Sequence, residues 1–359
     1  MDVWAEITDG INYVPKLCRT LNHYQLSEIE IAVSQDGSFL LFLDEENQIA
    51  VSWWVSPKRT RSYPYSRVYD TLCFAGKKVT IIPIMKDEGK DGERDFLQWD
   101  TISLMSLLGI YVIIGYYAKA EKSSKYANKI THQKFDFAYL QKELKNLQNY
   151  HSDALHWNLS QVEKVNEIAR MAIASYEQIS MDSKVEMHSL NVANKRLNQL
   201  YKSKDEFMKL SRNLAEEAQK REALTVQPKE NLSGTKATLT IKNFLGGCYF
   251  FTCDEVKIVD NSIYLVEGKH NKQGLIPSSE DIKDGLLKMM LFTNLNEVKV
   301  GGRQYFPVPI LKLTSRKKVS RDALSQKQIE VLKKLKDEAE TNNFKVQVND
   351  LYICEIKLE

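Results

Sequence analysis

Residues 253–270 read CDEVKIVDNSIYLVEGKH, and this stretch decides how the C-terminal third of the chain folds. Residues 260–262 have turn chemistry between two runs rich in β-branched and aromatic residues, which predicts an antiparallel hairpin. Because side chains alternate along a strand, Glu267 and Lys269 point to one face of it. Asp254 is expected on the apolar face of the preceding strand. The hairpin therefore brings two carboxylates and a lysine together.

Two carboxylates beside a lysine predict a metal-dependent hydrolytic site. Hard cations such as Mg²⁺ bind carboxylate oxygens, keep several waters and accept substrate phosphates. Asp254 and Glu267 suit such a cation, with a backbone carbonyl as a further ligand. Lys269 is expected over the scissile phosphate, where it orients the nucleophile or offsets developing negative charge. Glu255, the neighbour of Asp254, remains its rival as the first carboxylate.

The Glu-x-Lys tripeptide alone is uninformative, because it recurs at Glu143–Lys145, Glu255–Lys257 and Glu297–Lys299, among other places. Context selects Glu267–Lys269. It ends an apolar strand, follows an aspartate on a paired strand and precedes a helix that begins with a capping signature at residues 278–281. The alternative interpretation is that this tripeptide lies at the solvated end of an edge strand and that the aspartate caps a turn.

Together, these residues resemble the PD-(D/E)xK nuclease superfamily, and type II restriction endonucleases in particular. The resemblance covers residues 237–300 and rests on a short motif, in which Cys253 replaces the usual proline. It implies an α/β fold with a restriction-endonuclease-like core, a mixed sheet flanked by helices. It also implies that Asp254 and Glu267 bind Mg²⁺ and that Lys269 assists the attacking water.

The resemblance also implies partners. The substrate would be double-stranded DNA, cut at a specific sequence. A palindromic site would favour a homodimer, because each half-site then meets an identical subunit. A cognate DNA methyltransferase is expected to be encoded nearby.

The rest of the chain predicts a three-part organisation. Residues 1–134 alternate β-rich runs with turns and are interpreted as an N-terminal α/β module with a role in DNA recognition. Residues 135–223 lack glycine and proline and carry apolar residues at three- and four-residue steps, which predicts antiparallel helices that act as a clamp or a dimer contact. After a linker-like segment, residues 235–359 form the expected nuclease domain.

Basic and aromatic side chains are expected to contact DNA. Residues 57–67 mix positive charges with aromatic rings, a combination suited to phosphate and base contacts, although a solvated surface loop has the same composition. A second basic stretch follows the nuclease strands, and the helix after Glu267 adds lysines. The expected contacts are Lys58, Arg59, Arg61, Tyr63, Tyr65, Arg67, Lys283, Arg316, Lys317 and Lys318, with Lys288 beside Lys283.

Composition excludes several classes of protein. With 43% hydrophobic and 27% charged residues the chain is globular, and a net charge of +3 says nothing about polyanions. The most hydrophobic stretch, residues 102–117, is shorter than the ~20 residues of a spanning helix. The cysteines form no CxxC pair and no secretory signal precedes them, which favours a reducing cytoplasm without a zinc site or disulfide framework. No phosphate-binding glycine loop occurs.

Two other functions stay open. One is a non-catalytic scaffold that binds DNA or protein through residues 135–223, for which the carboxylates would be dispensable. The other is a repair nuclease of the same superfamily that recognises DNA structure instead of sequence. The recognition sequence itself does not follow from these residues, because base readout depends on about three or four side chains whose groove positions are unknown.

Overall fold

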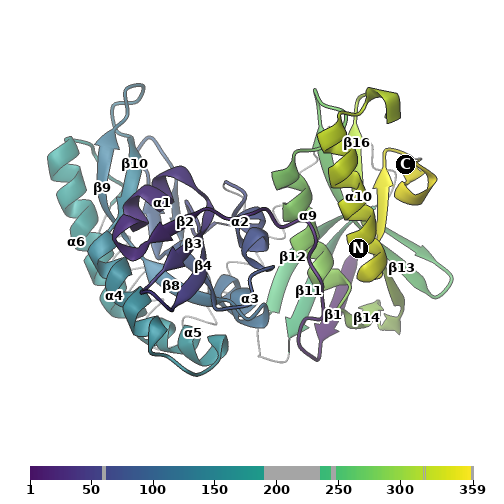
Figure 1. Ribbon diagram of the computed structural model, residues 1–359, viewed down its shortest axis with the longest axis horizontal. Helices are drawn as coiled ribbons and strands as arrows, with labels where there is room; N and C mark the ends of the chain where they lie inside the picture. The colour runs from purple at the N-terminus through teal and green to yellow at the C-terminus, as the bar shows by residue number, and fades with distance from the viewer. Residues whose placement is uncertain (59–61, 190–234, 244–247, 318, 320, 357–359) are drawn as a thin grey trace. The chain divides into compact units, whose positions relative to one another are not determined.

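The computed structural model describes residues 1–58, 62–189, 235–243, 248–317, 319 and 321–356 (Figure 1). The chain is a mixed α/β protein that divides into two compact units. Unit 1 combines Met1–Arg19 with Leu214–Glu359, and unit 2 is Thr20–Asn213. Each unit has its own sheet.

Unit 1 is built on a nine-stranded mixed sheet in the order β15-β14-β1-β11-β12-β13-β16-β17-β18. The strands are β1 (Asp2–Ile7), β11 (Thr235–Asn243), β12 (Cys248–Val259), β13 (Ser262–Asn271), β14 (Asn296–Val300), β15 (Arg303–Gln304), β16 (Phe306–Ser315), β17 (Lys345–Val348) and β18 (Leu351–Tyr352). Strands β11, β12 and β13 form an antiparallel meander, and β16 and β17 continue from β13 in parallel.

Helices supply the crossovers that parallel neighbours need. Helix α9 (Ser279–Phe292) lies between β13 and β16 in the chain, and α10 (Gln326–Thr341) lies between β16 and β17. Glu267, Leu311 and Val346 stand side by side in the ladder and are 2%, 0% and 1% exposed. Gly285 of α9 lies against Leu311, so α9 covers the face of the sheet that carries Glu267.

Strand β12 contains a bulge at the predicted carboxylates. Its pairing with β11 shifts by one residue between Ala237 and Thr235, so Asp254 and Glu255 together stand opposite a single residue of β11. A bulge bends the strand and re-aims its side chains, and bulges are frequent next to active sites. The simple alternation that the sequence suggests along this strand is therefore interrupted at these two acidic residues.

Unit 2 has a five-stranded sheet in the order β2-β3-β4-β5-β8 and two small sheets, β6-β7 and β9-β10. Its strands are β2 (His23–Gln25), β3 (Ser38–Phe42), β4 (Gln48–Trp53), β5 (Lys78–Pro83), β6 (Met85–Asp87), β7 (Arg94–Phe96), β8 (Tyr111–Gly115), β9 (Tyr117–Lys122) and β10 (Ile130–Phe135). Its helices are α1 (Ile29–Gln35), α2 (Pro64–Thr71), α3 (Trp99–Leu107), α4 (Phe137–Gln148), α5 (Ala154–Glu163) and α6 (Val165–Ser183). Helices α4 and α5 pack on β8, and α6 packs on β9.

Short 3₁₀ turns complete the described elements, at Leu26–Glu28, Arg321–Ala323 and Ile353–Glu355. The division into units differs from the three-part expectation. Strand β1 pairs with β11, so the N-terminal residues belong to the C-terminal sheet. The helices expected from residue 135 onward are present as α4, α5 and α6, but they belong to unit 2. The remainder of that expected helical region, from residue 190, lies outside the described residues.

The hydrophobic stretch 102–117 forms the greater part of α3 and the whole of β8, and it packs inside unit 2. In the described part of the chain no helix is both long and apolar enough to cross a membrane. Cys18 and Cys73 are disulfide-bonded, so the expectation of a chain without disulfides is wrong. Cys248, Cys253 and Cys354 are free thiols.

Candidate active site

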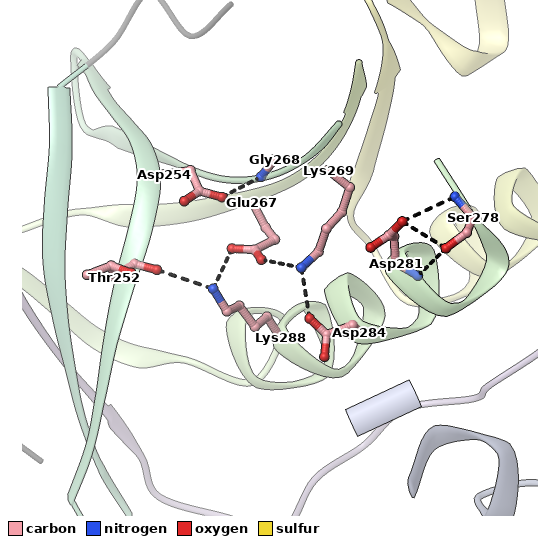
Figure 2. Close-up of polar contacts among 9 residues, drawn as sticks. All are labelled: Thr252, Asp254, Glu267, Gly268, Lys269, Ser278, Asp281, Asp284 and Lys288. Atoms are coloured by element: carbon pink, nitrogen blue, oxygen red, sulfur yellow. Dashed lines mark hydrogen bonds and ion pairs between the residues drawn. The ribbon is translucent and has the colours of Figure 1, made fainter. Parts of the chain in front are cut away.

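Strands β12 and β13 separate at the position of the predicted catalytic residues. Their pairing ends at Glu255 and Val266, beyond which β12 follows β11 and β13 follows β16. Asp254 and Glu267 are the next residues on the two strands, so both stand where the strands diverge, here called the fork. The Asp254 carboxylate accepts the backbone N–H of Gly268 at 2.8 Å (Figure 2).

Four charged side chains form a continuous row of alternating sign next to the fork. Lys288 Nζ lies 2.6 Å from Glu267 Oε2, and Lys269 Nζ lies 3.0 Å from Glu267 Oε1. On its other side, Lys269 Nζ lies 2.8 Å from Asp284 Oδ2. Figure 2 shows Glu267 between the two ammonium groups, with Asp284 and Lys288 both reaching up from α9. We call Asp284, Lys269, Glu267 and Lys288 the charge row.

Burial and charge act in opposite directions on this row. Burial raises the pKa of Glu267, but the ammonium groups of Lys288 and Lys269 outweigh it and hold that pKa below its usual range. Burial lowers the pKa of Lys269, yet Glu267 and Asp284 bring it above its usual range. Burial likewise lowers the pKa of Lys288, and Glu267 and Asp254 more than compensate. The carboxylate and both ammonium groups are therefore charged at neutral pH.

Helix α9 is shaped to receive Lys269. A Cβ atom at Gly285 would lie 2.7 Å from Leu311 Cδ1 and 3.2 Å from Lys269 Cε, so the missing side chain leaves the space that Lys269 crosses. The start of the helix is fixed by a capping box, in which Ser278 Oγ accepts the N–H of Asp281 and the Asp281 carboxylate accepts the N–H of Ser278.

Cys253, which stands where the nucleases that the sequence resembles have proline, has surroundings that indicate a structural role. It is fully buried, and its Sγ contacts the carbonyl oxygens of Glu255 at 3.3 Å and Val266 at 3.2 Å. Burial raises the pKa of the thiol, so it stays protonated and donates. The side chain therefore ties the bulge in β12 to β13 and is not a thiolate nucleophile.

The structure separates Asp254 from its rival Glu255. In the ladder with β16, Glu267 pairs with Leu311 and Gly268 pairs with Lys312, so Lys312 points to the opposite face from Glu267. Glu255 Oε2 lies 3.9 Å from Lys312 Nζ, on that opposite face. Asp254 instead contacts the amide that follows Glu267. Asp254 is accordingly the carboxylate that shares the fork.

The edge-strand interpretation of Glu267–Lys269 is wrong. Strand β13 lies between β12 and β16, and Glu267 is buried. The same tripeptide at Glu297–Lys299 shows the contrast, because its ion pair of 2.7 Å has side chains that are 51% and 36% exposed. Glu267 is thus buried in the core, as are Glu143 and Glu255 of two other copies, whereas Glu297 lies on the surface.

The fork fits Mg²⁺ in its donor chemistry. Proteins hold this cation with one or two carboxylates, and water and substrate phosphates complete its shell. Asp254 and Glu267 supply two carboxylates. Since the described residues contain no group of three or more potential metal-ligating side chains, the other ligands would be waters, a backbone carbonyl and the substrate. Both Glu267 oxygens contact ammonium groups, so a cation bound to either oxygen would compete with one of them.

Three of the expected DNA contacts are corrected by the structure. Arg67 stacks on the ring of Trp53 at 4.4 Å and donates to the Trp53 carbonyl at 2.9 Å. Tyr65 is 5% exposed and packs edge-on against Trp54. Lys283 is 6% exposed on α9. These side chains are engaged inside their units and are not presented to a ligand.

Four expected contacts remain on the surface: Lys58, Tyr63, Arg316 and Lys317. Arg59, Arg61 and Lys318 lie outside the described residues. Sequence reasoning missed Asp284 and gave Lys288 a different role, as a contact to the DNA backbone. The signal that pointed to both was their i, i+4 spacing, which puts an acid and a base on one side of the helix that follows the Glu-x-Lys strand.

The chain was also compared with known proteins, and no protein family, curated protein or solved structure matches it. The assignment of function rests on the site itself.

Proposed function

We propose that this protein is a Mg²⁺-dependent endonuclease that hydrolyses phosphodiester bonds in double-stranded DNA at the fork. One observation carries the proposal: two diverging strands bring Asp254, Glu267 and Lys269 together at the fork, and the carboxylate of Glu267 is buried there. The strand order β11-β12-β13-β16, with α9 between the last two in the chain, supports a restriction-endonuclease-like core.

Each residue has a distinct task in this proposal. Asp254 and Glu267 hold the cation, which when bound activates a water and offsets charge on the phosphate. Lys269 orients the attacking water and places positive charge where negative charge develops. Asp284 keeps Lys269 in position through their ion pair of 2.8 Å. This ion pair fixes the position of the ammonium group, which keeps its proton and its positive charge.

The finer features of the proposal come from the resemblance. They are cleavage at a specific sequence, a homodimer on a palindromic site and a cognate methyltransferase. Surface contacts to DNA are assigned to Lys58, Tyr63, Arg316 and Lys317, all of which are exposed. Phosphate contacts of this kind set affinity and its salt dependence, whereas base contacts set specificity.

A second candidate is a scaffold without catalysis. One observation favours it: the charge row is complete without a metal, because every member already has a partner of opposite charge. Such a row would then serve to hold α9 against the sheet. Buried ion pairs are weak contributors to stability when compared with apolar residues of the same size, so this role alone is a poor reason for four charges.

The test is cleavage of plasmid and phage DNA by the purified protein, with Mg²⁺ or EDTA. Wild type is expected to cut only with Mg²⁺, and Glu267→Gln and Lys269→Met are each expected to lose about 100-fold or more in rate. The matched controls are Glu297→Gln and Lys299→Met, which alter the same tripeptide on the surface of β14 and should cut like wild type.

The pattern of products separates the candidates. Discrete fragments indicate a site-specific enzyme, and cleavage confined to branched or flapped DNA indicates a structure-specific nuclease. Intact DNA across Mg²⁺, Mn²⁺ and salt concentrations would favour the scaffold. Cleavage that persists in both site variants would place the active site elsewhere.

A further inference from the structure

The ammonium group of Lys288 lies among oxygen atoms at the fork. Its Nζ is 2.6 Å from Glu267 Oε2 and 3.4 Å from the carbonyl oxygen of Thr252 on β12. The ring of Phe251 lies 6.0 Å away. Figure 2 shows this group on the β12 side of Glu267, the side on which Asp254 stands. A carboxylate oxygen and a backbone carbonyl thus face one cation.

These oxygens are of the kind that Mg²⁺ takes in proteins. An ammonium group bonds to such oxygens at about 2.7–3.0 Å, and Mg²⁺ binds them at about 2.0–2.1 Å. The same donor set therefore accommodates either cation, but not both, because the two positive charges would compete for Glu267 Oε2.

Lys288 differs from Lys269 in how firmly it is held. Lys269 is fixed from two sides, by Glu267 and by Asp284. Within the described residues, Lys288 has one ion pair, with Glu267. The two side chains are almost equally exposed, 14% for Lys288 and 15% for Lys269, so the number of ion pairs is what separates them. With one carboxylate to leave instead of two, Lys288 is the lysine that a cation displaces more easily.

We infer that Lys288 is a positioning residue that occupies the cation position of the fork in the metal-free protein, and that a divalent cation binds by displacing it from Glu267. This inference rests on the proposed function, because it assumes the metal site at Asp254 and Glu267. It gives Lys288 two tasks. The ammonium group holds the Glu267 carboxylate in place before the metal arrives, and it weakens metal affinity by competing for one oxygen.

The inference predicts an effect opposite in sign to that of a structural or DNA-binding lysine. Removing the charge of Lys288 leaves Glu267 Oε2 open and removes a positive charge next to the incoming cation. Metal affinity should therefore rise in Lys288→Met. Loss of a merely structural contact would leave affinity unchanged or lower it.

The experiment measures the Kd for Mn²⁺ by electron paramagnetic resonance of the free ion, with full-length protein and no DNA. Lys288→Met is expected to bind Mn²⁺ roughly 10-fold or more tightly than wild type, since a nearby charge of the same sign is removed. Lys288→Gln, a second neutral variant, should do the same. Lys288→Arg keeps the charge and should bind no better than wild type.

Lys312→Met is the matched control. It removes a positive charge from the opposite face of the same sheet, beside Glu255, so it reports the effect of net charge alone and should leave the Kd near the wild-type value. Circular dichroism and thermal unfolding establish that each variant is folded. If Lys288→Met does not fold, Lys288→Gln carries the test.

The outcomes separate the two proposals. If Glu267→Gln and Asp254→Asn lose Mn²⁺ binding but neither neutral Lys288 variant binds more tightly than wild type, the inference fails and the proposed metal site stands. If Glu267→Gln and Asp254→Asn bind like wild type, the proposed site itself is wrong. If no variant and no wild-type protein binds Mn²⁺, both are overturned.

Discussion

At the scale of single residues, Glu267 is a carboxylate that stays ionised although it is only 2% exposed. Removing a charge from water is costly, and an ion pair offsets that cost only when geometry and hydrogen bonding are good. Two ammonium groups within 3.0 Å supply that compensation here. Small changes in the space around the charge row should therefore have large effects.

Gly285→Ala tests how tightly that space is filled. The added methyl group would meet Leu311 at 2.7 Å and Lys269 at 3.2 Å, so we expect α9 to shift and unit 1 to lose about 1–3 kcal/mol of stability. The cleavage rate should fall because Lys269 moves. Thermal unfolding and the plasmid assay measure the two effects. Gly10→Ala is the control, because its Cβ has open space; equal behaviour of the two variants would contradict the prediction.

Glu143 of α4 gives unit 2 a dependence on pH. Burial raises the pKa of its carboxyl group, but hydrogen bonds from Gln161 and Lys164 outweigh burial and lower that pKa below the usual 4.5. A carboxyl group with a lowered pKa in the folded state stabilises the fold above its unfolded-state pKa, and this contribution is lost as the pH falls through the folded-state value.

We therefore expect Glu143→Gln to destabilise unit 2 by about 1–3 kcal/mol at pH 7 and by progressively less below pH 4.5. Hydrogen exchange of α4 and α5 amides at pH 7 and pH 4 measures the difference. A difference that stays constant over this range would show that the ionised form is not what stabilises the fold. Exchange in unit 1 should not change.

At the scale of elements, α9 carries both Asp284 and Lys288, so the point at which it begins matters for the site. Ser278→Ala removes the capping interaction and should destabilise the helix by about 1 kcal/mol. Because the cap lies less than two turns from Asp284, we expect cleavage to weaken as well. Denaturant unfolding and the plasmid assay report the two effects.

Ser325→Ala is the matched control for this prediction. Ser325 caps α10 in a capping box of the same type, and α10 carries no member of the charge row. Its loss should cost similar stability and leave the cleavage rate of the folded protein unchanged. If both variants cleave equally well, α9 does not need its cap to hold the site.

Some elements were predictable from sequence because local signals were strong. The turn at residues 260–262 and the alternating strands predicted the β12–β13 hairpin, and the capping signature at residues 278–281 predicted the start of α9. Strand periodicity also placed Glu267 and Lys269 on one face, as the structure has them.

Strand β16 was not predicted from the sequence. Pro307 and Pro309 disfavour a central strand, since proline has no N–H to donate. The structure tolerates them because they lie opposite Ile263 and Leu265 of β13, before the pairing with β17 begins at Ile310. Only the pairing of β16 with β13 and β17 in the folded protein distinguishes this segment from a loop.

The alternation of polar and apolar residues in the sequence likewise did not predict the bulge in β12. Sequence alternation alone leaves Asp254 and Glu255 as rivals, because a bulge adds one residue and changes which side chain reaches which face. The register with β11 and the contact with Gly268 decide between them. Lys288 was misassigned for a related reason, since a lysine on the helix after a Glu-x-Lys strand has the same local sequence signal whether it faces a ligand or a buried carboxylate.

At the scale of the whole molecule, unit 1 is assembled from two segments far apart in the chain. Strand β1 lies between β14 and β11, and Val3 is 2% exposed between Leu239 and Val300. The candidate active site therefore depends on a sheet whose interior includes residues from the N-terminus. The three-part division missed this, because pairing between distant strands leaves no local signal.

Val3→Asp should destabilise unit 1 by more than about 3 kcal/mol, since it buries a charge within the sheet. Hydrogen exchange should accelerate in β11 and remain unchanged in β5 of unit 2. Thr8→Asp, which puts the same charge on an exposed residue just after β1, is the control. Slow exchange in β11 of Val3→Asp would contradict the central position of β1.

The pairing of β1 with β11 also determines when unit 1 can fold during synthesis. Residues 2–7 leave the ribosome well before residues 235–243 exist, and at about 5–20 residues per second the delay is roughly 10–50 s. Unit 2 is contiguous and can complete its core during that interval, whereas the sheet that holds Asp254 and Glu267 cannot close until residues 345–348 have been synthesised. The charge row is therefore incomplete in a nascent chain until α9 has been synthesised, and the proposed activity cannot appear before that point.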